Sequence, residues 1–365
     1  MSPDRLTVGI DATPLLGLRT GIGRYVEHLV DELGRRPDEV SVRAAAFSVR
    51  GRHALQDLPP DVRVVHRPVP ARLLHRAWLR GDRPRAELVM GRADVVHGTN
   101  FVLPPPRRAA GVVTVHDLAF LHYAELVDAA SLAYRELVPR AVRAAAVVLT
   151  PTQAVADEVC GAYRIPPERV RATPLGVDES WFDAPAQLPA GLPKQYLLAV
   201  GTLEPRKGLD VLLAAYRELP EAPPLVLVGP PGWGPALDTA GLRDRVILPG
   251  YVDGATLRAL VAGAELLAFP SRYEGFGLPP LEALAAGTAV VASDITAVRE
   301  VVGDPGRIAR LVPPGDPAAL AGALREALAH PPTPQDRDAG RRHAATFTWS
   351  ACAHATLAAY RAAIG

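Results

Sequence analysis

Lysine is nearly absent from this sequence: only Lys194 and Lys207 occur among 40 basic residues. Aromatic residues are also few, at 5% of the chain. The two cysteines, Cys160 and Cys352, are far apart and lack a CxxC partner, so we expect neither a disulfide nor a thiolate metal site. The basic residues are balanced by 39 acidic ones, which leaves a net charge of +1. This balance excludes a global field that recruits nucleic acid or an anionic membrane, so a charged ligand must be bound by local groups.

Long apolar runs are missing as well. No run of about 18 apolar residues without charges occurs, and the opening MSPDRLTVGIDATP has no apolar run behind a basic head. We therefore expect a cytoplasmic protein without a membrane span or a secretory signal. Arginine and alanine are so abundant that a cluster of arginines is by itself weak evidence for a site.

The pattern of hydrophobic runs indicates two α/β domains. The 365 residues, 48% of them hydrophobic, exceed the roughly 250 to 300 at which one core stops growing. Short β-branched runs alternate with longer alanine-rich amphipathic runs, which is typical of parallel strands joined by helical crossovers. In the first half we predict a helix from about Gly23 to Leu33 and the strands LTVGI, VRAAAF, VRVVH, DVVHG, GVVTVHD and AVVLTPT.

A proline- and glycine-rich stretch, residues 185–195, is typical of a linker between domains. After it we predict helices near 209–219, near 255–262 and from about 280, and the strands YLLAVGTLE, PLVLVG, RVILPGY, LLAFPS and TAVVAS. The predicted fold is α/β, with two Rossmann-like doubly wound domains facing each other across a cleft that binds ligands. Their predicted bounds are 1–183 and 184–345, and 346–365 is a helix that can pack back on the first domain.

The segment GTLEPRKGLDVLL has the features of a diphosphate site. A predicted strand ends at Gly201, and a helix begins near Leu209 with Arg206 and Lys207 before it. Cations at a helix N-terminus oppose the helix dipole, so their presence there is better explained by an anion bound between them. The alternative is a pair of solvated charges on a loop.

The segment SRYEGFGLPPLEALAAG places two carboxylates on different elements. Glu274 follows a strand in a turn, Gly277 frees the backbone to approach a ligand, and Glu282 is expected in the first turn of a helix started by prolines. Glu274 can reach a hydroxyl-rich group, and Glu282 can accept hydrogen bonds from a vicinal diol such as ribose. The alternative for Glu282 is helix stabilisation by ~0.3 to 1 kcal/mol.

In the first half, His116 lies at the carboxyl end of the predicted strand VVTV and can donate to a sugar hydroxyl. Asp117 can orient this histidine or bind an acceptor. His97, with Asn100 nearby, is a similar and weaker candidate. For both histidines the alternative is a buried structural residue. Further acceptor candidates at the start of the first helix are Arg24 and Tyr25.

The run EGFGLPPLE resembles the E-x7-E motif of retaining glycosyltransferases of family 4, which have the GT-B fold, and the loop with Arg206 and Lys207 resembles their diphosphate loop. The resemblance covers nearly the whole chain, including RTGIGRYVEHLV, PTQAVADEV, PLGVD, LPGYV and FTWSACAHATLAAYR. It is similar above all to the branch with mannosyltransferases of bacterial polysaccharide assembly.

The resemblance implies roles for individual residues. Arg206 and Lys207 neutralise the leaving diphosphate, Glu274 holds the transferred sugar, Glu282 binds ribose, and His116 serves the reaction from the first domain. The implied donor-binding set is Gly21, Gly23, Gly201, Arg206, Lys207, Glu274, Phe276, Gly277, Leu278 and Glu282. The implied activity is retaining transfer of a hexose, with mannose from GDP-mannose preferred over a UDP- or dTDP-sugar. No metal or other cofactor is expected, and the acceptor is a saccharide, a lipid-linked or a small molecule.

Alternatives from other classes are weaker. A nicotinamide enzyme needs G-x-G-x-x-G directly after the first strand, where this chain has DATP. A phosphorylase needs a lysine for pyridoxal phosphate, and Lys207 is better explained by a diphosphate. A non-catalytic sugar-nucleotide-binding module stays open. Residues 67–85, rich in arginine, either touch lipid headgroups at the inner membrane face or form a surface helix.

Overall fold

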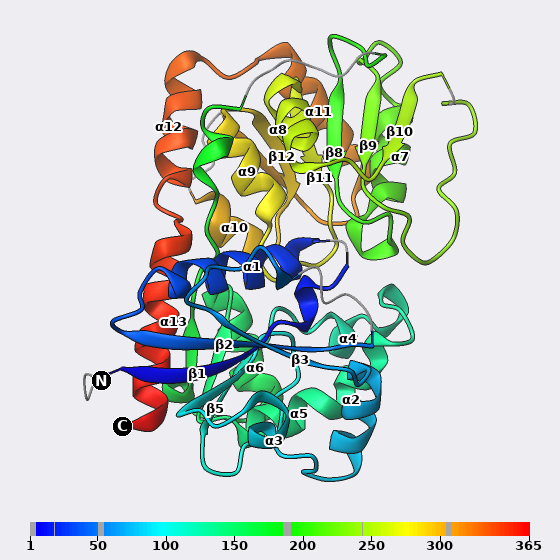
Figure 1. Cartoon of the computed structure of the whole chain (residues 1–365). Helices are drawn as coiled ribbons and strands as arrows, with labels where there is room; N and C mark the ends of the chain where they lie inside the picture. Colours follow the sequence, from blue (N-terminus) through cyan, green and yellow to red (C-terminus); the bar gives the residue numbers. More distant parts are fainter. Residues whose placement is uncertain (1–4, 18, 50–54, 185–190, 243, 304–307) are drawn as a thin grey trace. The chain divides into compact units, whose positions relative to one another are not determined.

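The computed structural model describes residues 5–17, 19–49, 55–184, 191–242, 244–303 and 308–365. The chain divides into two compact units (Figure 1). One unit consists of Met1–Leu121, Ala129–Gly176 and Trp349–Gly365, and the other of His122–Asp128 and Val177–Thr348. Most of the predicted linker, residues 185–190, lies outside the described residues.

The first unit contains a parallel sheet in the order β3-β2-β1-β4-β5-β6-β7. Its strands are β1 (Leu6–Asp11), β2 (Val40–Phe47), β3 (Arg63–Arg67), β4 (Val95–Gly98), β5 (Ala110–Thr114), β6 (Val147–Thr150) and β7 (Val170–Ala172). The helices are α1 (Gly21–Gly34), α2 (Ala71–Arg80), α3 (Ala86–Met90), α4 (Ala119–His122), α5 (Tyr134–Ala144), α6 (Gln153–Tyr163) and α13 (Trp349–Ile364), with a short 3-10 helix η1 (Thr13–Leu15).

Helices cover both faces of this sheet, which explains its nearly continuous apolar strands. On one face α13 packs against α1 and along β4, β5 and β6. On the other face α3 lies close to β1, because a Cβ added at Gly9 would lie 3.6 Å from the Cβ of Met90. Likewise α5 lies close to β5, because a Cβ added at Gly111 would lie 3.3 Å from the carbonyl oxygen of Ala144. The amphipathic pattern of α1 follows from Val26, Leu29, Val30 and Leu33, which are buried at helical spacing.

The second unit contains a parallel sheet in the order β10-β9-β8-β11-β12-β13. Its strands are β8 (Leu197–Val200), β9 (Leu225–Val228), β10 (Val246–Gly250), β11 (Leu266–Phe269), β12 (Ala289–Ser293) and β13 (Ala309–Val312). Its helices are the 3-10 helix η7 (Pro205–Lys207), α7 (Leu209–Arg217), α8 (Gly254–Gly263), α9 (Leu278–Ala286), α10 (Thr296–Val302), α11 (Pro317–Ala329) and α12 (Pro334–Ala344). The strand orders of the two sheets confirm the predicted doubly wound α/β fold.

Two details differ from the sequence predictions. Helix α9 begins at Leu278 rather than near Pro280, so Glu282 is its fifth residue and no acidic residue lies in its first turn. The dipole therefore does not explain Glu282, which is 1% exposed. The edge strands β7 and β13 were not predicted, because each is short and each carries an arginine, Arg171 and Arg310.

Candidate functional site

In the second unit, two loops meet where the central strands end. Strand β8 ends at Val200, and η7 follows after a short turn. Gly208, which joins η7 to α7, has a φ of 63°, and a Cβ there would lie 2.1 Å from the carbonyl oxygen of Pro270. Only glycine fits this contact. The contact holds the loop of Arg206 and Lys207 against the carboxyl end of β11, from which the loop of Glu274 starts.

The two loops share a charge cluster, which we define as Glu204, Arg206, Lys207 and Glu274. One oxygen of Glu274 accepts a hydrogen bond from Arg206 Nη1 at 2.9 Å, and the other accepts one from Lys207 Nζ at 2.5 Å. Ser271 Oγ donates to the same carboxylate at 2.8 Å. The structure thus brings Arg206 and Lys207, predicted in one segment, into contact with Glu274, predicted in another.

The cluster controls the charge of Glu274, which is buried at 9% exposure. Burial alone raises the pKa of this carboxyl group. The ammonium of Lys207 and the guanidinium of Arg206 outweigh burial and lower the pKa to about 2. Glu274 is therefore a carboxylate at every physiological pH, and it holds both cations in place.

Glu204 was not predicted as a site residue. It is buried at 7% exposure, and its carboxylate contacts Arg206 through Nε at 3.1 Å and Nη2 at 2.8 Å. Arg206 Nη1 also donates to the carbonyl oxygen of Tyr273 at 3.1 Å. In the sequence, Glu204 is recognisable only as an acidic residue two positions before Arg206. Such a residue looks the same as a charge exposed to solvent on a loop.

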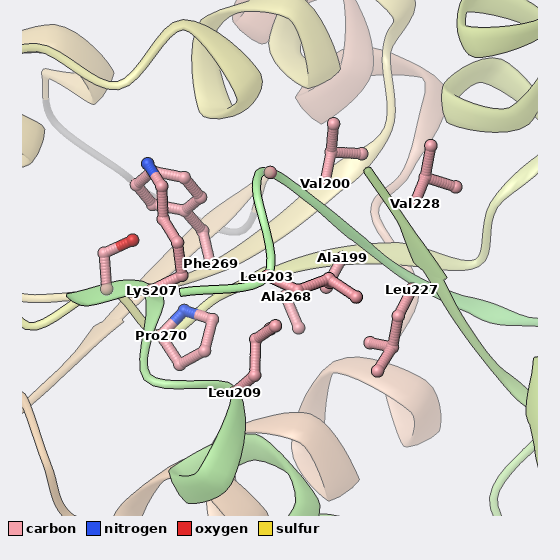
Figure 2. Close-up of a pocket in the computed structure, with 12 residues that line it drawn as sticks. Ala199, Val200, Leu203, Lys207, Leu209, Leu227, Val228, Ala268, Phe269 and Pro270 are labelled. Carbon is pink, nitrogen blue, oxygen red and sulfur yellow. The ribbon is translucent and has the colours of Figure 1, made fainter. Parts of the chain in front are cut away.

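The side chain of Lys207 crosses the strand ends, with its ammonium 5.7 Å from the ring centre of Phe269 (Figure 2). Beneath it a small cavity is lined by the ends of β8, β9 and β11, including Gly201, Leu203 and Ser271. Its volume is about 10 Å³, which admits roughly one water molecule. This cavity is therefore too small to hold a nucleotide.

The loop before α9 supplies the remaining predicted donor residues. Gly277 is the N-cap of α9 with a φ of 113°, which favours glycine. Its neighbours Phe276 and Leu278 are buried at 5% and 8% exposure. Glu274 lies on the loop and Glu282 inside the helix, so the two carboxylates belong to different elements, as the sequence predicted.

In the first unit, polar groups follow the ends of adjacent strands. His116, two residues after β5, donates from Nε2 to the carbonyl oxygen of Thr99 at 2.8 Å. The Thr99 hydroxyl in turn donates to the carbonyl oxygen of Asp11 at 2.6 Å. Burial lowers the pKa of His116, so its imidazole is neutral at pH 7. These bonds link the carboxyl ends of β1, β4 and β5.

Asp11 is a second site candidate that the sequence did not predict. It is 7% exposed at the end of β1, and its Oδ1 accepts the backbone N–H of Thr13 at 2.9 Å. Burial raises its pKa to about 6. Close to the end of β4, the side-chain oxygen of Asn100 is buried and has no hydrogen-bond partner among the described residues. An acceptor hydroxyl can satisfy such groups.

The structure corrects the prediction for Tyr25. Its side chain is 1% exposed, its hydroxyl bonds Thr114 at 3.0 Å, and its ring packs edge-on against His116. Tyr25 is therefore buried against His116, and its hydroxyl is already bonded within the first unit. His97 is fully buried, with its ring nitrogens 2.7 Å from Thr114 and from the hydroxyl of Tyr360. Burial lowers the pKa of His97 to about 3, so this residue is structural.

The other first-unit candidates lie around the same strand ends. Gly21 and Gly23 begin α1, and the half-buried Arg24 follows them. Asp117 accepts the backbone N–H of Ala119 at 3.0 Å and so caps the short α4. This bond uses one carboxylate oxygen of Asp117.

Residues 67–85 include α2, whose Leu74 and Trp78 are buried in the first unit at 5% and 3% exposure, whereas Leu73 is 50% exposed. The burial of two of its apolar side chains favours a surface helix packed on the unit. Over the part of the chain that the structure describes, no helix combines the length and apolarity needed to cross a bilayer. Among the same residues, no group of three histidine, cysteine or acidic side chains is arranged to hold a metal.

Comparisons with known proteins agree with this architecture. Residues 19–181 match the model of Glycosyltransferase Family 4, and residues 194–330 that of Glycosyl transferases group 1. The chain is 33% identical over 311 residues to O-antigen chain mannosyltransferase B of Escherichia coli, covering 80% of this chain and 78% of that protein. It is 35% identical over 238 residues to MMP alpha-(1->4)-mannosyltransferase of Mycolicibacterium hassiacum, covering 63% and 57%.

Solved structures show the same fold. Sucrose-phosphate synthase from Thermosynechococcus elongatus superposes with a TM-score of 0.75 at 22% identity over 98% of both chains. The lipopolysaccharide glycosyltransferase WaaG gives a TM-score of 0.69 at 19% identity over 97% of this chain and 98% of that one. The chain belongs to the family 4 glycosyltransferases and is a glycosyltransferase of the GT-B fold.

Proposed function

We propose that this glycosyltransferase transfers a hexose with retention from a nucleotide-sugar to a hydroxyl acceptor, and that the donor is GDP-mannose. The names of two relatives, an O-antigen chain mannosyltransferase and an α-(1→4)-mannosyltransferase, support mannose. The acceptor is a saccharide, a lipid-linked or a small hydroxylated molecule, and the reaction takes place in the cytoplasm.

The observation that carries the proposal is the contact of Arg206 and Lys207 with Glu274 at the strand ends of the second unit. As the bond between sugar and phosphate breaks, negative charge develops on the leaving diphosphate. Two cations held beside it stabilise that charge, an effect worth about 3 kcal/mol per well-placed group in related cases. The burial of the cluster strengthens this effect, because little water screens it.

Glu274 changes partners during the cycle. Without donor its carboxylate neutralises Arg206 and Lys207. When the diphosphate occupies the two cations, the carboxylate is released to accept hydrogen bonds from the hydroxyls of the transferred hexose. Because each partner is charged or hydrogen-bonded in both states, the exchange leaves no buried charge unpaired.

Retention follows a front-face course in this proposal. The acceptor hydroxyl approaches the same face of the sugar that the leaving phosphate departs from, and a phosphate oxygen takes the hydroxyl proton. Glu274, bonded to two cations, is held as a sugar ligand rather than a nucleophile. His116 and Asn100 bind the acceptor or sugar hydroxyls, Glu282 binds ribose, and no metal ion is required.

Calorimetry of nucleotide binding tests the donor site. Arg206→Ala and Lys207→Ala should each weaken binding of GDP by about tenfold or more, as expected for loss of one charge-assisted contact. An exposed arginine of the same unit, Arg217, pairs with Asp238 and provides the matched control Arg217→Ala. Unchanged GDP affinity in both site variants contradicts the phosphate assignment.

Glu274→Ala tests the sugar assignment. We expect turnover to fall by at least a hundredfold while GDP binds at least as tightly as it does to wild type, because Glu274 contacts the sugar and, without donor, neutralises the two cations that bind the diphosphate. NMR of the anomeric proton in the product distinguishes retention from inversion directly. Full activity of Glu274→Ala, or an inverted product, rejects this part of the proposal.

The alternative donor is a UDP-sugar. Solved structures of Anabaena HepE, with a TM-score of 0.66 to this chain, contain UDP. A thermal-shift screen of GDP, UDP, ADP and dTDP and their sugars separates the donors, because a bound nucleotide raises the unfolding temperature. Nucleotide binding without transfer to any hydroxyl, even to water, favours the non-catalytic module instead.

A further inference from the structure

The charge cluster has an unusual balance. It contains two cations, Arg206 and Lys207, and two carboxylates, Glu204 and Glu274, so its net charge without a donor is zero. Both carboxylates are at least nine-tenths buried. Arg206 contacts Glu204 through Nε and Nη2 and Glu274 through Nη1. Its guanidinium is therefore satisfied before any ligand arrives.

A neutral cluster is a poor receptor for a diphosphate. A nucleotide-sugar carries two negative charges on its diphosphate, and in a buried site these repel both carboxylates over a few ångströms. In the proposed function the Glu274 carboxylate avoids this repulsion, because it leaves the two cations and accepts hydrogen bonds from the sugar hydroxyls. Glu204 cannot turn away in the same manner, because its carboxylate is bound to two nitrogens of Arg206, the group that must serve the phosphate.

Three charged side chains act on Glu204 from the two loops of the cluster. On its own loop these are Arg206 and Lys207, and on the loop after β11 it is Glu274. Arg272, which donates to the carbonyl oxygen of Pro205, is already paired with Asp210.

The two carboxylates differ in how readily they take a proton. Burial raises the pKa of Glu204, and the opposing effects of Arg206 and Lys207 do not cancel it. The pKa of Glu274 is instead lowered to about 2. When an anion approaches, Glu204 is thus the carboxylate nearer to protonation.

We propose that Glu204 is a positioning residue that takes up one proton from solvent when a nucleotide-sugar binds to Arg206 and Lys207. This inference rests on the proposed donor site. The carboxylate of Glu204 becomes a neutral carboxyl group, whose carbonyl oxygen still accepts a hydrogen bond from Arg206. The net charge contributed by the four side chains rises from zero to +1, and the proton returns to solvent when the nucleotide leaves.

The test is calorimetry with GDP-mannose, and with UDP-glucose if GDP-mannose fails to bind. A nucleotide-sugar is used because each of its two phosphates is esterified and keeps only one, strongly acidic, ionisable oxygen, whereas a free nucleoside diphosphate has a phosphate proton of its own that titrates near neutral pH. Titrations at pH 7.5 in HEPES and in Tris, which differ in ionisation enthalpy, report the number of protons taken up. We expect uptake of up to one proton, and a Kd that rises up to tenfold per pH unit between 7 and 8.5.

Glu204→Gln should abolish the linkage. The amide keeps a hydrogen-bond acceptor for Arg206 and cannot titrate, so the binding enthalpy should be equal in both buffers and the Kd constant with pH. A residue with a purely structural role would leave proton uptake unchanged in this variant. Glu326, an exposed carboxylate near Arg310 in the same unit, gives the control Glu326→Gln, which should behave as wild type.

The outcomes separate the two proposals. Binding with no proton uptake by the wild-type protein, or uptake that persists in Glu204→Gln, overturns the inference and leaves the donor site standing. If the wild-type protein binds neither nucleotide-sugar, the donor site and this inference both fall. Should Glu204→Gln not fold, the wild-type buffer dependence and pH profile still decide, because a pH-independent Kd contradicts the inference.

Discussion

Burial raises the pKa of the buried carboxylates in both units, but the net shifts are opposite, because cations surround only Glu274. Glu274 is surrounded by Lys207 and Arg206, and its pKa falls to about 2. Asp11 accepts hydrogen bonds from Thr13, and its pKa rises to about 6. At the scale of single residues this contrast predicts opposite dependences of stability on pH.

Glu274→Gln should be less stable than wild type at neutral pH, and this difference in unfolding free energy should shrink in acid. A depressed pKa stabilises the fold above about 4.5, and this contribution disappears as the pH falls toward about 2. At ~1.4 kcal/mol per pKa unit its upper limit is about 3 kcal/mol. Urea denaturation at pH 6, 4 and 3 should therefore show a shrinking difference between wild type and Glu274→Gln. A constant difference would mean that the cations contribute little.

Asp11→Asn should show the reverse trend. A raised pKa gives stability that is present below about 3.8 and is lost as the pH rises through about 6. Wild type then loses up to about 3 kcal/mol between pH 4 and pH 7, and the asparagine variant does not. The stability of Asp11→Asn relative to wild type should rise over this range and level off above it. Its transfer activity should fall if Asp11 contacts the acceptor.

The sequence predicted the residue types of the charge cluster but not its contacts. Arg206, Lys207 and Glu274 were identifiable because cations before a helix and a carboxylate between glycines need an explanation. Glu204 and Asp11 were not, because a carboxylate becomes informative only when its burial is known, and burial depends on residues distant in sequence. Tyr25 was misassigned for the same reason, since its bond to Thr114 spans 89 positions.

At the scale of elements, the connection between η7 and α7 depends on Gly208. Gly208→Ala places a Cβ 2.1 Å from the Pro270 oxygen at a φ of 63°. We expect a loss of about 3 kcal/mol or more in unfolding free energy, together with weaker nucleotide binding, because both loops must shift. Gly315→Ala is the matched control, with a φ of 77° and no atom within 4 Å of the added Cβ. Its cost should be only the conformational one, about 1 kcal/mol.

A hydrogen bond between the hydroxyl of Tyr360 and Nδ1 of His97 connects helix α13 to β4. Tyr360→Phe leaves a buried ring nitrogen of His97 without this partner, which should cost about 1 to 3 kcal/mol. Cys352, 1% exposed on the same helix, provides a local readout, since burial raises its pKa to about 12 and suppresses its reactivity. Thiol labelling at Cys352 should accelerate in the variant. The exposed Tyr251 gives the control Tyr251→Phe, which should label as wild type does.

Element types were predictable where the hydrophobic pattern is strong. The central strands of both sheets read as continuous apolar runs because they are buried on both faces. The edge strands β7 and β13 did not, since partial exposure admits arginine. The start of α9 was placed late because proline marks the first turn of a helix but not its first residue, which is Leu278.

At the scale of the whole molecule, the two units should respond differently to a nucleotide. Hydrogen exchange in the presence of GDP should slow in the second unit at residues 201–208 and 271–278, where the loops of the charge cluster lie. Strands β4 to β6 of the first unit should exchange at unchanged rates. Protection confined to the first unit would contradict the assignment of the donor to the second.

The position of α13 also has a consequence for synthesis on the ribosome. This helix is at the end of the chain, yet it belongs to the unit that begins the chain and covers β4, β5 and β6 (Figure 1). Translation reaches Tyr360 only after the entire second unit has been made, so the partner of His97 is synthesised 263 positions after it. A premature stop codon just before Trp349 would therefore remove part of the first unit while leaving the second unit whole.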